Sequence, residues 1–156
     1  MTTIIRQQAE RPMRWGKRVE PRGSDVVTPT GEKLPPRKEI KRELDLIRAS
    51  AQEAFDSRRR FWFYPMLTDV YRFFTKVKKI RRSKKCAQIA AAHYGINLDD
   101  DPIRVFIDVV TPGPVNNKSR RRWAVGLRKL WKRKVSPEGV DAFFKANGGI
   151  AGCARL

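Results

Sequence analysis

Few residues in this chain carry the chemistry of a catalytic site. His93 is the only histidine among 156 residues, so any pair of a nucleophile and an imidazole base would depend on it. It ends the apolar run Ala90-Ala91-Ala92-His93-Tyr94, where a structural histidine is the simpler interpretation. We therefore expect no catalytic residue, and a protein that is not an enzyme.

Three consecutive aspartates at positions 99–101 offer oxygen ligands for a divalent metal ion. Pro102 directly after them favours another role, because an aspartate cap followed by proline is a typical helix start. No phosphate-binding loop of the form G-x-x-x-x-G-K-[ST] occurs in the chain. The sequence thus predicts neither a metal site nor a cofactor.

The two cysteines, Cys86 and Cys153, are too few for a disulfide scaffold, and with one histidine they cannot build a zinc module. We expect both thiols to be buried or incidental. A second interpretation concerns Cys86 alone, because the neighbouring Lys84 and Lys85 would depress its pKa and make the thiol reactive.

Positive charge is the main functional signal. Lys and Arg number 35 against 16 Asp and Glu, which gives a net charge of +19 and a pI near 10.8. Most of the excess lies in two runs, and both are predicted to bind nucleic acid. The first run comprises Lys76, Lys78, Lys79, Arg81, Arg82, Lys84 and Lys85; the second comprises Arg120, Arg121, Arg122, Arg128, Lys129, Lys132 and Arg133, flanked by Lys118 and Lys134.

The second run has the periodicity of a helix over 119–134, with Ser119 as the expected cap. Apolar residues recur on one side of this helix and must face a core, which directs the cations outward. An ordinary solvated helix alternates charges, whereas here like charges stand four residues apart and repel. Such an arrangement favours a polyanion as the partner. The apolar side comprises Trp123, Leu127, Leu130 and Trp131.

Other segments give weaker signals. Residues 1–35 are rich in proline and glycine and are interpreted as a flexible basic arm that could enter a groove, with Trp15 either stacking on a base or packing back. Arg58, Arg59 and Arg60 form a third, small basic cluster. The aromatic run 61–64 that follows is interpreted as core rather than as a stacking platform.

The remaining patterns predict an all-α fold: one small helical domain, residues 36–156, of about six helices, preceded by the arm. Pro65 is expected to end or kink the first helix, and the β-branched residues of 102–110 leave a strand as an alternative there. The expected helices are 36 to about 64, 66–82, 83–94, 102–110, 119–134 and 137–147, with Ser83 capping the third and Gly95 ending it.

The function predicted from these features is non-enzymatic nucleic-acid binding, most simply by a double-stranded DNA-binding regulator or accessory factor. A helix-turn-helix formed by 102–110 and 120–134 matches loosely, because the turn between them is long. The alternatives are an RNA-binding component of a ribonucleoprotein and a protein-docking module whose binding survives high salt. A homodimer or a protein partner is compatible with either. Lacking an apolar span or a signal peptide, the chain is expected in the cytoplasm, at the nucleoid.

Overall fold

Helices account for all regular secondary structure between residues 36 and 156, the part of the chain that the computed structural model describes. The predicted arm, residues 1–35 with Trp15, lies outside the described residues. Within them the all-α prediction is confirmed. The elements are α2 (Arg37–Asp56), α3 (Phe63–Lys79), α4 (Ser83–Tyr94), α5 (Pro102–Val110), α6 (Asn117–Lys132), the 3₁₀ helix η2 (Pro137–Gly139), α7 (Val140–Ala146) and α8 (Gly149–Ala154).

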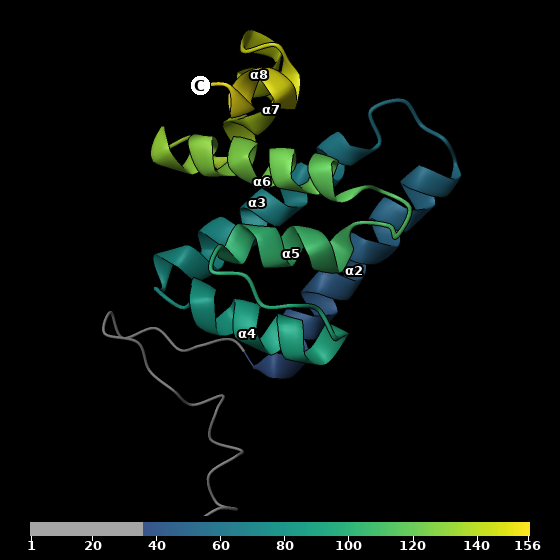
Figure 1. The fold of residues 1–156 in the computed structure, drawn as a ribbon. Coiled ribbons are helices and arrows are strands. Elements are labelled where there is room, and N and C mark those ends of the chain that lie inside the picture. The colour runs from purple at the N-terminus through teal and green to yellow at the C-terminus, as the bar shows by residue number, and fades with distance from the viewer. Residues whose placement is uncertain (1–35) are drawn as a thin grey trace, which may run out of the picture.

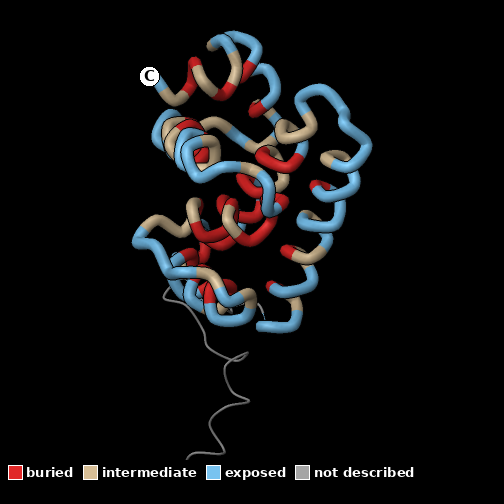
Figure 2. The backbone as a smooth tube through the Cα atoms, turned by 45° about the vertical axis from the view of Figure 1, so that its right-hand side comes forward, coloured by how far each residue is buried: buried red, intermediate tan, exposed pale blue. Residues whose placement is uncertain are grey.

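Helix α5 is the centre of the fold (Figure 1). It lies between α4 and α6 and also contacts α2 and α3, so six of its nine residues are buried. A helix that is apolar on nearly all sides needs such an interior position. Buried residues of α3, α5 and α6 gather inside the molecule, and exposed ones follow the outer turns (Figure 2).

Local signals set the ends of the central helices. The Asp101 carboxylate accepts a hydrogen bond from the backbone N–H of Ile103 at 3.2 Å, so the predicted cap of α5 is confirmed and the strand alternative is wrong. Gly95 ends α4 with φ of 66°, as expected for a left-handed helix terminator. Ser83 is the first helical residue rather than the cap, since Arg82 occupies the cap position.

Three boundaries differ from the sequence-based expectation. Helix α2 ends at Asp56, and Pro65 lies in the first turn of α3, where the missing N–H has no helical partner to lose. The cap of α6 is Asn116, whose side chain accepts from the N–H of Ser119 at 2.8 Å. Helix α6 therefore begins at Asn117, before the expected start.

The C-terminal segment contains a helix that the sequence did not predict. Asn147-Gly148-Gly149 was expected to end the last helix, but α8 follows directly and packs along α6. The approach is close, because a Cβ added to Gly126 of α6 would lie 2.3 Å from Ile150 Cδ1. Helix α8 thereby covers part of α6 and leaves the basic part exposed.

Candidate nucleic-acid interface

Helix α6 carries its cations on two different sides. One side faces α5, where Arg120 lies 3.6 Å from Asp108 and Arg128 lies 3.4 Å from Asp101. Asp101 precedes α5 and Asp108 is near its end, so α5 and α6 run in opposite directions as an antiparallel pair (Figure 1). The helices of a helix-turn-helix cross at about 90–120°. The pair α5–α6 therefore does not have the geometry of the loosely matching helix-turn-helix.

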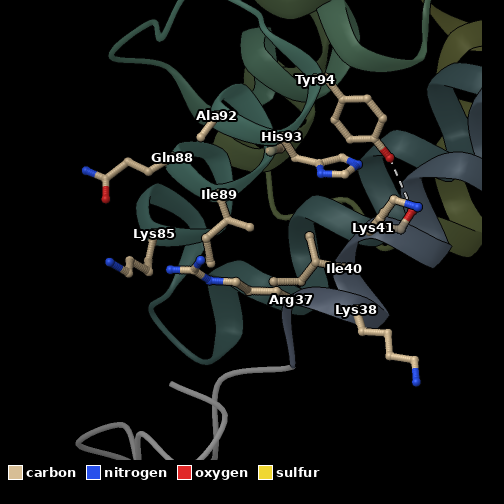
Figure 3. A pocket seen from close by; sticks show the side chains of 11 residues that line it. Arg37, Lys38, Ile40, Lys41, Lys85, Gln88, Ile89, Ala92, His93 and Tyr94 are labelled. Carbon is tan, nitrogen blue, oxygen red and sulfur yellow. Dashed lines mark hydrogen bonds between the residues drawn. The ribbon is translucent and has the colours of Figure 1, made fainter. Parts of the chain in front are cut away.

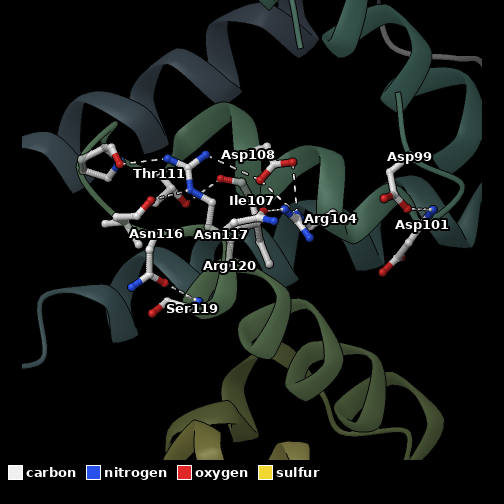
Figure 4. A network of polar contacts seen from close by, with 12 residues as sticks. Asp99, Asp101, Arg104, Ile107, Asp108, Thr111, Asn116, Asn117, Ser119 and Arg120 are labelled. Atoms are coloured by element: carbon white, nitrogen blue, oxygen red, sulfur yellow. Dashed lines mark hydrogen bonds and ion pairs between the residues drawn. The ribbon is translucent and has the colours of Figure 1, made fainter. Parts of the chain in front are cut away.

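A polar network fixes the loop between these helices (Figure 4). Arg104 Nε donates to both carboxylate oxygens of Asp108 at 3.1 Å, and Arg104 Nη2 donates to Asn117. Arg120 donates to the carbonyl oxygens of Val115 at 3.2 Å and Pro112 at 3.0 Å. We expected Arg120 to contact nucleic acid, but its guanidinium is mostly buried and is engaged in holding this loop.

The opposite side of α6 is open to solvent. Arg121, Arg122, Lys132 and Arg133 are exposed and Lys129 is half-buried. Arg128 stands between the two sides, with 47% of its side chain exposed beside Asp101. Trp123, Leu127 and Leu130 are buried, as expected, and Trp131 is half-buried against the core. No acidic residue lies between positions 117 and 134. We call this exposed side of α6 the outer row; its cations are Lys118, Arg121, Arg122, Lys129, Lys132, Arg133 and Lys134.

The first basic run surrounds the junction between α3 and α4. Lys78, Lys79, Arg81, Lys84 and Lys85 are exposed, and Arg82 is half-buried. Lys76 is bound to Glu43 of α2 at 2.6 Å. Five of the seven predicted residues thus face solvent, and we call these five the junction cluster.

The C-terminal ends of α3 and α6, which lead into the junction cluster and the last cations of the outer row, pack against each other. The rings of Phe74 in α3 and Trp131 in α6 make an edge-to-face contact at 5.5 Å between centroids. The Tyr71 hydroxyl donates to the carbonyl oxygen of Val135 at 2.6 Å, and burial raises the pKa of Tyr71 to about 12. The C-terminal ends of α3 and α6 accordingly lie on the same side, at the left of Figure 1. Sequence reasoning found both runs but had no means to bring them together.

Helices α3 and α6 are each followed by a cationic residue in the left-handed backbone conformation, which is unusual for such a residue. Arg81 and Lys134 follow the caps of α3 and α6 with φ of 58° and 57°. Arg81 N–H donates to the carbonyl of Lys78 at 2.9 Å, and Lys134 N–H donates to that of Trp131 at 3.0 Å, as in a Schellman motif. Glycine is the usual residue at this position because its left-handed conformation has no Cβ penalty. A lysine and an arginine here extend the basic surface at a cost in backbone energy.

A third basic segment lies at the other end of α6. Arg58, Arg59 and Arg60 are exposed in the turn between α2 and α3, at the upper right of Figure 1. Phe61 beside them is 54% exposed, although the aromatic run 61–64 was expected to be core. Trp62, Phe63 and Tyr64 are half-buried, so that expectation applies to them only in part.

A cavity of about 500 Å³ lies between the start of α2 and α4 (Figure 3). Lys85 of the junction cluster lines it together with Arg37 and Lys41, and Ile40 and Ile89 contribute its apolar wall. None of the described residues that line it is acidic. The cavity therefore extends the positive surface toward the beginning of α2.

The histidine and the two cysteines that were considered for chemistry lie in different environments. His93 is exposed at the cavity between α2 and α4 rather than packed as a core histidine. Both cysteines are buried, as expected. Burial raises the pKa of Cys86 to about 12, so the alternative of a reactive thiol is wrong; Lys76 and Arg82 only partly offset that burial. Among residues 36–156 no group of three or more His, Cys, Asp or Glu side chains is placed to hold a metal ion.

In the part of the chain that the structure describes, no helix combines the length and the apolar character needed to cross a membrane. No protein-family model matches the chain, and no curated protein or solved structure shows significant similarity to it.

Proposed function

We propose that this protein binds double-stranded DNA through the outer row of α6 and the junction cluster, without catalysing a reaction. The observation that carries the proposal is the separation of charges on α6. The carboxylates near this helix, Asp101 and Asp108, are engaged by Arg128 and Arg120 on the side that faces α5. The outer row remains free of acid, and its mutual repulsion is relieved when phosphates neutralise it.

The dimensions of the surface suit a duplex. Helix α6 has 16 residues and is about 24 Å long, which corresponds to about seven base pairs at about 3.4 Å each. The junction cluster lengthens the surface beyond the end of α6. The buried Trp123, Leu127 and Leu130 hold the helix in place, so its cations lose little extra freedom on binding. In this proposal the protein is a regulator or accessory factor associated with the nucleoid.

Titration of the full chain against a fluorescent duplex, by anisotropy at several salt concentrations, tests the proposal. With roughly five to eight phosphates engaged, the slope of log K against log salt is expected to be about −4.5 to −7. A slope near zero would reject phosphate binding. Tighter binding to structured RNA than to the duplex at every salt concentration would instead favour the ribonucleoprotein alternative.

A further inference from the structure

The turn between α2 and α3 holds its residues in a strained conformation. Arg58 and Phe61 have φ of 53° and 57°, in the left-handed region. Arg58 follows the cap of α2, where its N–H donates to the carbonyl of Phe55 at 3.0 Å. Phe61 has no such helix-ending role, and a bulky residue is rare in this region. The ring of Phe61 contacts those of Phe63 and Tyr64, yet the residue remains 54% exposed at this strained position.

Aromatic packing beneath the turn makes it rigid. The rings of Phe63 and Trp123 are stacked at 5.2 Å, and Trp62 meets Trp123 edge-on at 6.0 Å. The hydroxyl of Tyr64 accepts a hydrogen bond from the N–H of Ile150 at 3.3 Å. The three residues that follow Phe61 are therefore tied to α6 and α8, which limits the movement of the backbone at Phe61.

A second cavity opens beside the exposed ring. It has a volume of about 360 Å³, and Phe61, Tyr64 and Phe144 form its aromatic walls. Asp141 and Lys145 also line it. Planar aromatic walls with polar groups nearby are suited to a flat heterocycle, which stacks on the rings and forms hydrogen bonds at its edge.

Cations surround the same ring. The guanidinium of Arg60 lies over the Phe61 ring at 4.9 Å from its centroid, and Arg58 and Arg59 are exposed next to it. Because Trp62 contacts Trp123, the turn lies against the buried side of the first half of α6. Arg121 and Arg122 precede Trp123 on the exposed side of the same helix turn. A nucleic-acid strand that reaches this turn would place its phosphates near the arginines of the turn and its bases near Phe61.

We propose that Phe61 stacks on an unpaired base of the bound DNA, with Arg58, Arg59 and Arg60 contacting the flanking phosphates. This inference rests on the proposed function and adds a preferred substrate, a duplex with a bulged or otherwise unpaired base. Exposed phenylalanines that meet bases stabilise such distorted DNA, and an aromatic ring stacks on any base without reading its sequence.

The test compares two fluorescent duplexes that differ only in one bulged 2-aminopurine. The wild-type protein is expected to bind the bulged duplex about tenfold more tightly and to quench the 2-aminopurine by stacking. Phe61→Ala should remove both the preference and the quenching, while Phe61→Trp should retain them. Leu46→Ala removes another exposed apolar side chain, 65% exposed on α2, and should change neither.

The outcomes separate this inference from the proposed function. Salt-dependent binding of both duplexes with equal affinity would overturn the stacking site and leave the proposed function intact. Preference and quenching that persist in Phe61→Ala would also overturn it. Absence of binding to both duplexes at low salt would reject the proposed function and the stacking site together. Circular dichroism of each variant confirms that the helices are present.

Discussion

The role of each arginine on α6 depends on what lies opposite its side chain. Arg120 and Arg128 face α5 and meet Asp108 and Asp101, whereas Arg121 points to solvent one residue away from Arg120. All are equally basic in the sequence. Charge counting therefore assigns too many residues to a binding surface when some of them hold the fold together.

Arg128→Ala is expected to destabilise the protein, and Lys132→Ala is not. Burial raises the pKa of Asp101, and the charge of Arg128 partly offsets this effect. When the pKa of a carboxyl is higher in the folded than in the unfolded state, the free energy of unfolding is reduced at pH values above that pKa. The reduction disappears as the pH falls through it. Without Arg128 the loss of stability at pH 7 should increase by about 0.5–1 kcal/mol, a small value because the Arg128 side chain is half exposed.

Urea unfolding of the two variants at pH 7 and in acid measures this effect. The difference between Arg128→Ala and wild type should shrink as Asp101 becomes protonated, while Lys132→Ala follows the wild type throughout. An Arg128→Ala variant as stable as the wild type at pH 7 would show that the 3.4 Å contact with Asp101 contributes nothing.

At the residue scale, sequence patterns predicted which residues are buried better than which residues they contact. The period of Trp123, Leu127 and Leu130 identified the inner side of α6, and their burial is confirmed. It did not reveal that α5 flanks this side with two aspartates, because that depends on the packing of another helix. The exposed Phe61 was missed for a similar reason: an apolar run predicts core unless a turn directs one member outward.

At the scale of elements, the ends of α3 and α6 each carry a charged residue at a cost in stability. Arg81 and Lys134 stand where glycine would avoid a penalty of about 1 kcal/mol, only partly repaid by a cation at a helix C-terminus. Arg81→Gly and Lys134→Gly should therefore be up to about 1 kcal/mol more stable. Each should also weaken DNA binding and flatten the salt slope by about 1.

Arg81→Ala and Lys134→Ala are the matched controls, because they remove the cation and retain the Cβ. Thermal unfolding and anisotropy titration of all four variants separate the two effects. Equal stability of the glycine and alanine variants would show that the left-handed backbone carries no cost here. Unchanged binding in all four would exclude both helix ends from the interface.

Helix α8 depends on the absence of side chains at its glycines. A Cβ on Gly152 would lie 1.6 Å from the carbonyl oxygen of Asn147, a backbone atom that cannot rotate away. Gly152→Ala should therefore displace α8 and destabilise the protein by about 1–3 kcal/mol. Gly113→Ala is the control, since a Cβ there meets nothing within 4 Å. Urea unfolding with equal midpoints for both variants would contradict this packing.

Local chemistry explains which elements were predictable. Asp101-Pro102 and Gly95 act through their own backbone neighbours, and both helix ends are confirmed. The cap of α6 is Asn116 rather than Ser119. Both side chains can accept a hydrogen bond from a backbone N–H, and the sequence does not rank them. Helix α8 was missed because it is six residues long, and its stability comes from packing on α6 rather than from a periodic pattern.

At the scale of the whole molecule, the fold unites charges that are distant in the chain. The contact between Phe74 and Trp131 packs α3, which leads into the junction cluster, against the last turn of α6. If one duplex spans both, Arg121→Ala with Lys132→Ala and Lys78→Ala with Lys79→Ala should each weaken binding. The α6 pair should have the larger effect, because its two residues lie on one helix whose opposite side is buried.

The variant that combines all four substitutions tests whether the two clusters act on the same duplex. Its loss of binding free energy should equal the sum of the two pairs, and its salt slope should be flatter by about 4. Arg72→Ala removes one exposed cation that Asp69 already neutralises within the same helix, so it should change the slope little. Anisotropy titrations at several salt concentrations measure each slope. A combined variant that binds no more weakly than the α6 pair would mean that the duplex contacts α6 alone, and that the junction cluster faces away from it.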